Sequence, residues 1–88
     1  MGADVKPQVN AVYRHYKGGI YLVVGHALHT ETEEDLVLYV RLGTQRVFAR
    51  PREMFTSTVI FGGMTYQRFR LDEAMLSRAG EDAYEEAR

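Results

Sequence analysis

Two histidines in this sequence are each followed, two residues later, by a second polar side chain that could take part in chemistry. His15 precedes Lys17, and His29 precedes Glu31. If each pair lies in extended chain, its two members point to the same side, and both pairs could converge on one pocket. Imidazole, carboxylate and ammonium groups serve in general acid–base catalysis, because histidine exchanges a proton near neutral pH.

Catalysis at such a pocket would lack a recognisable nucleophile. The sequence has no cysteine, no Gly-x-Ser-x-Gly elbow and no phosphate-binding loop. We therefore expect binding rather than enzymatic activity. A small enzyme or metal site built from His15, His29 and Glu31 is kept as an alternative, since two histidines and a carboxylate can hold a metal ion.

The spacing of these three residues matches no known metal-ligand motif. A structural role is favoured, in which Glu31 accepts hydrogen bonds from the loop backbone and Thr32 closes the turn. We accordingly predict no metal and no cofactor.

Tyrosines and basic residues are concentrated in residues 13–21, and two arginines further along the chain extend this set. Arg50 and Arg68 carry guanidinium groups, which grip a carboxylate or phosphate through two parallel hydrogen bonds. The alternative for Arg50 is an ion pair with Glu53 or with the acidic loop 31–35. Together these residues predict an aromatic and basic groove. Its candidate ligand-binding residues are Tyr13, His15, Tyr16, Lys17, Tyr21, His29, Glu31, Thr32, Arg50 and Arg68.

The elements that would position these side chains are mostly strands. Residues 20–29 and 35–42 are rich in β-branched and aromatic residues and flank a polar segment, which predicts a hairpin. The second run is apolar on both faces, so a coiled barrel, a C-terminal helix or a homodimer contact must cover one of them. Gly25 is a natural place for a bulge or bend.

The second half of the chain predicts shorter elements. A third strand over 46–49 is stopped by Pro51, a helical turn follows over 52–55, and a second hairpin over 58–69 turns at Gly62-Gly63. Five short strands favour a mainly β, SH3-like barrel (roll), and an apolar stripe from Leu71 onward predicts a short C-terminal helix.

Length and charge bound the other possibilities. A chain of 88 residues has room for one domain, for which we expect an N-terminal extension (1–10), a barrel (11–70) and an acidic tail (71–88). Residues 1–70 carry nine bases and six acids, net +3, whereas residues 71–88 carry two bases and six acids, net −4. The tail is either a solvated helix or a screen for a basic site. No apolar run could span a membrane and no secretory signal is evident, which favours the cytoplasm.

A succession of spaced motifs covers roughly residues 11–70. Its residues are Tyr13, His15, Tyr16, Lys17, Gly18, Tyr21, His29, Glu31, Thr32, Val37, Tyr39, Arg50, Pro51, Met54, Phe55, Arg68 and Phe69. This succession resembles one bacterial family, the domain of unknown function 1653 (DUF1653), and the resemblance implies a small SH3-type barrel and no established activity. Ala11 and Val12 replace a usual glycine and polar residue, and Phe48 stands where tryptophan is common, which removes an indole donor.

Two binding functions fit these observations. One is an interaction module that recognises a peptide, protein or anionic ligand through the aromatic and basic groove. The other is binding of single-stranded nucleic acid (RNA), which the basic body and the tyrosines favour but the acidic tail opposes.

Overall fold

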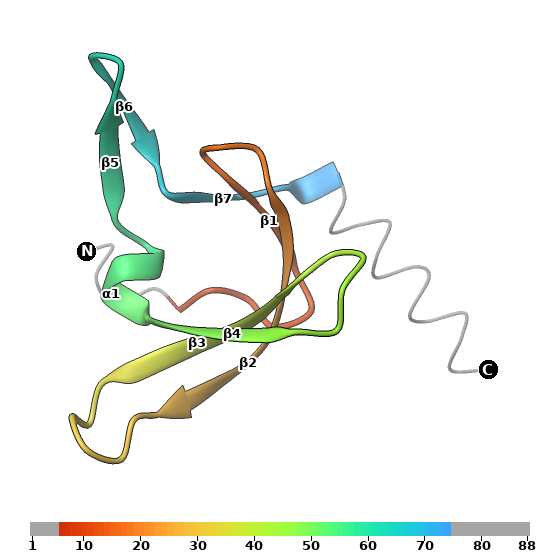
Figure 1. Cartoon of the computed structure of the whole chain (residues 1–88), viewed down its shortest axis with the longest axis vertical. Helices are drawn as coiled ribbons and strands as arrows, with labels where there is room; N and C mark the ends of the chain where they lie inside the picture. Colours follow the sequence, from red (N-terminus) through yellow and green to blue (C-terminus); the bar gives the residue numbers. More distant parts are fainter. Residues whose placement is uncertain (1–5, 75–88) are drawn as a thin grey trace.

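The computed structural model describes residues 6–74, which form a mainly β domain with seven strands and one short helix (Figure 1). The elements in chain order are β1 (Val12–His15), β2 (Ile20–Leu28), β3 (Asp35–Arg41), β4 (Val47–Pro51), α1 (Arg52–Phe55), β5 (Thr58–Phe61), β6 (Met64–Gln67) and β7 (Phe69–Leu71). Five strands form an antiparallel sheet in the order β4-β3-β2-β1-β7, and β5 pairs with β6 in a separate hairpin. The predicted mainly β class is confirmed.

The five-stranded sheet curves around its own core, so that β7 lies across from β3 and β4 in Figure 1. The rings of Tyr39 on β3 and Phe69 on β7 are 5.4 Å apart across this interior, although the two strands are not neighbours in the sheet. β4 and β7 are the edge strands, so the hydrogen-bonded ladder does not close into a barrel. The inner face of the sheet therefore brings together residues that are far apart in sequence.

Register decides which face of β3 lies inside. Val23 is opposite Tyr39, and Phe48 is opposite the same tyrosine on the other side, so these residues share the core face. Val37 and Tyr39 are buried, whereas Leu36, Leu38 and Val40 on the outer face are only half-buried. The face of β3 that carries Val37 and Tyr39 therefore belongs to the core, although the other face carries the leucines.

A bulge interrupts the pairing of β2 with β3 between Val23 and Gly25. Val24 is the extra residue and is 40% exposed. A bulge adds twist and bends the strand, so that β2 can follow the curvature of the sheet. The predicted irregularity at Gly25 is thus confirmed.

The core is largely aromatic. Phe55 of α1 stacks on Phe69 with ring centroids 4.1 Å apart, and the edge of Tyr13 meets Phe55 at 5.4 Å. Phe55 is 1% exposed, so the single turn of α1 covers one end of the core. The predicted helical turn over 52–55 has the bounds that were expected.

Two expectations about strand number change. The segment before Tyr16 is itself a strand, β1, and the predicted run 64–69 divides at Arg68 into β6 and β7. The division occurs because Arg68 N–H donates to Ser57 O, back toward β5, while Arg68 O accepts from Tyr16 N–H on β1's side. The chain thereby passes from the hairpin to the main sheet.

Both ends of the domain are attached to the sheet within the described residues. Asn10 N–H donates to Val23 O, and Asp72 N–H donates to Val12 O. Most of the helix predicted from Leu71 onward lies outside the described residues. Within residues 6–74, no helix has the length and apolar character needed to cross a membrane.

Candidate functional site

The β1–β2 turn, residues 16–19, is held by backbone hydrogen bonds. His15 N–H donates to Gly19 O at 2.8 Å, and Gly18 N–H donates to His15 O at 2.8 Å. Gly18 has φ +109°, which side-chain-bearing residues rarely adopt, so a glycine is needed for this turn. The turn fixes His15 at the end of β1 with its side chain beside the core.

His15 is surrounded by aromatic rings from three elements. Its ring centroid lies 4.6 Å from that of Tyr16, 4.9 Å from Phe69 and 6.3 Å from Tyr21. His15 Nδ1 accepts a hydrogen bond from the backbone N–H of Lys17 at 3.1 Å. In the neutral imidazole the proton then lies on Nε2, which makes that atom a donor.

Arginine side chains from two distant segments meet this aromatic cluster. The Arg50 guanidinium lies 5.5 Å from the Phe69 ring centroid, within the range of a cation–π contact. Arg68 Nε donates to Ser57 Oγ at 3.0 Å, which holds its guanidinium near the hairpin base. We call the set His15, Tyr16, Lys17, Tyr21, Tyr39, Arg50, Arg68 and Phe69 the His15 site.

The electrostatics of the His15 site are positive. Burial lowers the pKa of His15 below its ordinary value of 6.5, and the charges of Arg50, Arg68 and Lys17 lower it further. Burial also raises the pKa of Tyr39, an effect that the Arg50 charge and its hydrogen bond to Tyr39 oppose. The guanidinium of Arg50 is thus shared between a phenol and an aromatic face.

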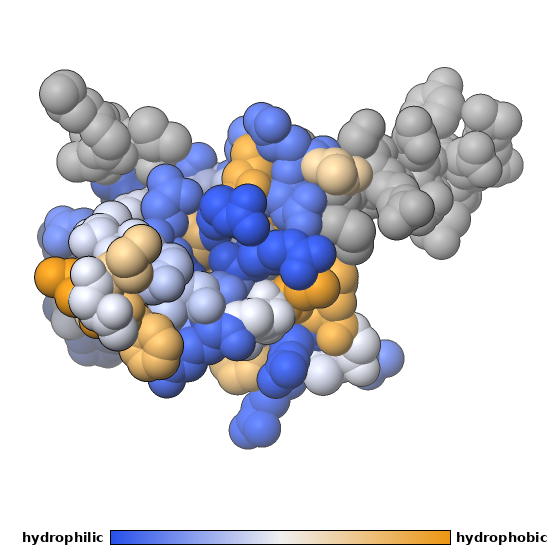
Figure 2. Space-filling view, turned by 90° about the horizontal axis from the view of Figure 1, so that it is seen from above, coloured by the Kyte–Doolittle hydropathy of each residue, from blue (hydrophilic) through white to orange (hydrophobic). Residues whose placement is uncertain are grey.

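Acidic residues do not neutralise these cations within the described part of the chain. The ion pairs found in residues 6–74 are Arg14–Asp72, His29–Glu31 and Arg52–Asp35. The acidic loop, which was the alternative partner for Arg50, pairs instead with Arg52, whose Nη2 lies 3.6 Å from Asp35 Oδ2. Figure 2 views the molecule from above relative to Figure 1 and shows strongly hydrophilic residues gathered near the middle of the face seen there.

The second histidine pair does not join the first. His29 follows the end of β2, whereas His15 is adjacent to its beginning, and a strand of nine residues separates them by roughly 30 Å. His29 Nδ1 accepts the backbone N–H groups of Glu31 at 3.2 Å and Thr32 at 3.3 Å, so it organises its own loop. The expectation that both pairs converge on one pocket is wrong.

Roles within the β2–β3 loop differ in part from those predicted. The loop N–H groups are accepted by His29 rather than by Glu31, whose carboxylate accepts from the Thr30 hydroxyl at 3.2 Å. Thr32 Oγ1 does close the turn, because it accepts the Glu34 N–H at 3.2 Å. No three His, Asp or Glu side chains of the described ranges lie close enough together to hold a metal ion.

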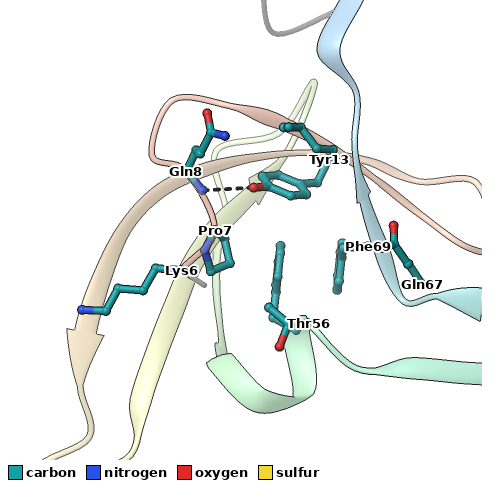
Figure 3. A pocket seen from close by; sticks show the side chains of 9 residues that line it. Lys6, Pro7, Gln8, Tyr13, Thr56, Gln67 and Phe69 are labelled. Atoms are coloured by element: carbon teal, nitrogen blue, oxygen red, sulfur yellow. Dashed lines mark hydrogen bonds between the residues drawn. The ribbon is translucent and has the colours of Figure 1, made fainter. Parts of the chain in front are cut away.

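Tyr13 belongs to a different region. Its hydroxyl accepts the Gln8 N–H at 3.0 Å, and its ring lines a cavity of about 390 Å³ together with Pro7, Phe55 and Phe69 (Figure 3). The cavity is also lined by residues 6–8, which precede β1, and by none of His15, Arg50 and Arg68. Tyr13 therefore contributes to the core rather than to the His15 site.

A groove of about 450 Å³ adjoins the His15 site. Its lining includes Arg14 and His15 from β1, Tyr16 from the β1–β2 turn, Tyr66 from β6 and Arg70 from β7. The ligand-binding residues predicted from the sequence did not include Arg14, Tyr39, Tyr66, Phe69 or Arg70. The dense aromatic content was the available signal for the rings, whereas only strand pairing brings Arg14 opposite Arg70.

The fold and this site define a small, mainly β domain whose curved antiparallel sheet carries a cationic, aromatic patch at one end. The chain belongs to the DUF1653 family, described as a protein of unknown function, whose family model matches residues 11–71. The crystal structure of a DUF1653 protein from Bordetella bronchiseptica is similar, with a TM-score of 0.64 and 36% sequence identity over 80% of this chain and 90% of that chain. None of the curated proteins matches this chain.

Proposed function

We propose that this protein is a cytoplasmic binding module whose His15 site recognises an anionic group, a carboxylate or a phosphate, carried by a peptide, protein or small ligand. The observation that carries the proposal is the group of three cations, Lys17, Arg50 and Arg68, which act together on His15 without an acidic partner among residues 6–74. A free anion would supply the missing negative charge.

The state of His15 supports binding rather than proton transfer. Its pKa is lowered, so the imidazole is neutral near pH 7, and its Nδ1 is already occupied by the Lys17 N–H. The remaining Nε2–H can donate a hydrogen bond to an anion. The Arg50 guanidinium is positioned by Phe69 and Tyr39, which lowers the entropy lost when a ligand binds.

Composition supports the cytoplasmic part of the proposal. The sequence contains no cysteine, and domains of this size in oxidising compartments commonly depend on disulfides. An aromatic core with the stacked Phe55–Phe69 pair replaces such covalent support here.

The test is a titration of the full chain, labelled for NMR, with inorganic pyrophosphate and separately with acetate. We expect saturable shifts at His15 and at the Arg50 and Arg68 side chains. Arg50→Gln and Arg68→Gln should each weaken pyrophosphate binding about tenfold, in the range of a charge-assisted hydrogen bond. Arg46→Gln is the matched control, because Arg46 is an exposed arginine in the β3–β4 connection.

Unchanged pyrophosphate affinity in both the Arg50→Gln and Arg68→Gln variants, with folded spectra, would contradict the proposed site. Shifts spread evenly over all arginines, Arg46 included, would also contradict it, since they would indicate general charge attraction.

A further inference from the structure

The β5–β6 hairpin faces the β1–β2 turn across the groove that adjoins the His15 site. Tyr16 and Tyr66 lie on its two sides, with ring centroids 6.4 Å apart and planes inclined by only 25°. Phe61, from the other strand of the hairpin, approaches Tyr16 edge-on at 6.0 Å. Two nearly parallel phenol rings therefore border one cavity.

The two sides of this groove differ in chemistry. Residues 58–67, which form the hairpin, contain no charged residue, and Ile60, Phe61 and Met64 are 78%, 59% and 60% exposed. Figure 1 shows the hairpin projecting from the sheet as a separate arm. Cations come from the opposite side, where Arg70 and Arg14 line the groove and Arg68 and Lys17 lie at the adjoining His15 site.

We propose that this groove binds single-stranded nucleic acid, with a base stacked on Tyr16 and Tyr66 and the neighbouring phosphates bound by Arg70 and the His15 site. The inference rests on the proposed function, because the His15 site would hold one of the phosphates. A nucleobase suits the two tyrosines because it is flat and apolar on both faces, and its phosphate lies next to it on the same chain.

Other ligands match the groove less well. Duplex nucleic acid buries its bases and requires a broad basic surface, whereas the groove and the His15 site together offer five cations around one pair of tyrosines. A phosphopeptide could use the cations but would need an aromatic side chain at a fixed distance from its phosphate to use the tyrosines. Arg14 contributes least, because Asp72 binds it at 2.6 Å.

The cations that have no acidic partner among residues 6–74 predict the salt dependence. If Lys17, Arg50, Arg68 and Arg70 each neutralise one phosphate, log K should fall with log salt with a slope of about −2.8 for a single strand. Affinity should then decrease about 50-fold between 50 and 200 mM salt.

The experiment is fluorescence anisotropy of the full chain with a labelled eight-nucleotide oligouridylate, and with oligothymidylate of the same length. We expect binding of either or both strands, weakened at least fivefold by Tyr66→Ala and by Arg70→Gln, and retained in Tyr66→Phe, which keeps the stacking face. Ile60→Thr is the control on the same hairpin, since Ile60 is highly exposed and lines no part of the groove.

Four outcomes would overturn the inference. Tyr66→Ala and Arg70→Gln variants that bind the oligonucleotides as the parent chain does would exclude the groove. Absence of oligonucleotide binding, while pyrophosphate still shifts the His15 site, would exclude nucleic acid but leave the proposed function standing. Preference for a phosphotyrosine peptide over both oligonucleotides, with the same loss in Tyr66→Ala, would assign the groove to a peptide. If neither pyrophosphate nor an oligonucleotide binds, both proposals fail.

Discussion

His15 is the residue in which burial, charge and hydrogen bonding act together. Its pKa is lowered by burial first and then by Arg50, Arg68 and Lys17. Between the lowered pKa of the folded state and the ordinary value of 6.5, the unfolded chain therefore binds more protons at His15 than the folded chain does. The contribution of His15 to the free energy of unfolding is thus fully present above pH 6.5 and is lost as the pH falls through the pKa of the folded state.

We expect an NMR titration of His15 to show a midpoint below 6.5, and saturating pyrophosphate to raise it, because a bound anion stabilises the imidazolium. Pyrophosphate affinity should accordingly increase as the pH is lowered through the His15 midpoint. A midpoint at or above 6.5 in the free protein, or one that pyrophosphate does not move, would contradict this account.

Phe55 is the residue on which the stability of the domain depends most directly. It is 1% exposed and stacks on Phe69 at 4.1 Å, so removal of its ring leaves a cavity next to the His15 site. Phe55→Ala should lower the free energy of unfolding by about 3–5 kcal/mol, measured by urea denaturation. Met54→Ala in the same helical turn is the control and should cost under about 1 kcal/mol, because Met54 is 46% exposed. An equal decrease in the free energy of unfolding for the two variants would contradict the role of Phe55 in covering the core.

Among the elements, the β1–β2 turn controls the position of Tyr21. A Cβ added at Gly19 would lie 2.8 Å from Tyr21 Cε2, closer than van der Waals contact allows. Because the contact is with the far end of a side chain, the Tyr21 ring can rotate away, and the backbone is not strained.

Gly19→Ala should therefore cost little stability but displace the Tyr21 ring from His15, reducing pyrophosphate affinity severalfold. Gly25→Ala is a matched control, since a Cβ there meets only Leu38 Cδ1 at 4.0 Å and the bulge at this position needs no positive φ. Thermal unfolding and the NMR titration give the two readouts. A large fall in melting temperature for Gly19→Ala, or an equal loss of affinity in both variants, would refute the explanation.

At the scale of the whole molecule, charge is distributed unevenly along the chain. Residues 75–88 contain four acids and two bases, net −2, so their removal changes the formal net charge from −1 to +1. Truncation after Ala74 should strengthen the binding of polyanions, most clearly at low salt, through the long-range field alone.

The measurement is anisotropy with the eight-nucleotide strand at 50 and 150 mM salt, with the full chain as reference. A variant in which Glu81, Asp82, Glu85 and Glu86 are all replaced by glutamine separates charge from chain length. Unchanged oligonucleotide affinity in both altered chains would show that the charge of residues 75–88 does not screen the His15 site.

Several local features of this domain could be predicted from the sequence alone. The turn at Gly62-Gly63 has φ of +60° and +79°, values that glycine adopts without strain, and Pro51 directly precedes the helical turn that was predicted. Gly25 marked the bulge in β2. Each of these features depends on the conformational preference of one or two residues, and such a preference can be read from the residue type alone.

Which side chains meet depends on contacts between distant segments. His15, Arg50 and Arg68 come together because the sheet curves until β7 lies across from β4 (Figure 1). Register places His15 opposite Phe69 and Arg50 opposite Val37, whereas Arg68 lies in the connection between β6 and β7. The same register sends His29 and Glu31 to the far end of β2, although their spacing matched that of His15 and Lys17. Spacing along the chain specifies the side on which a residue points, but strand order, register and curvature arise from contacts between distant segments, and these determine the site.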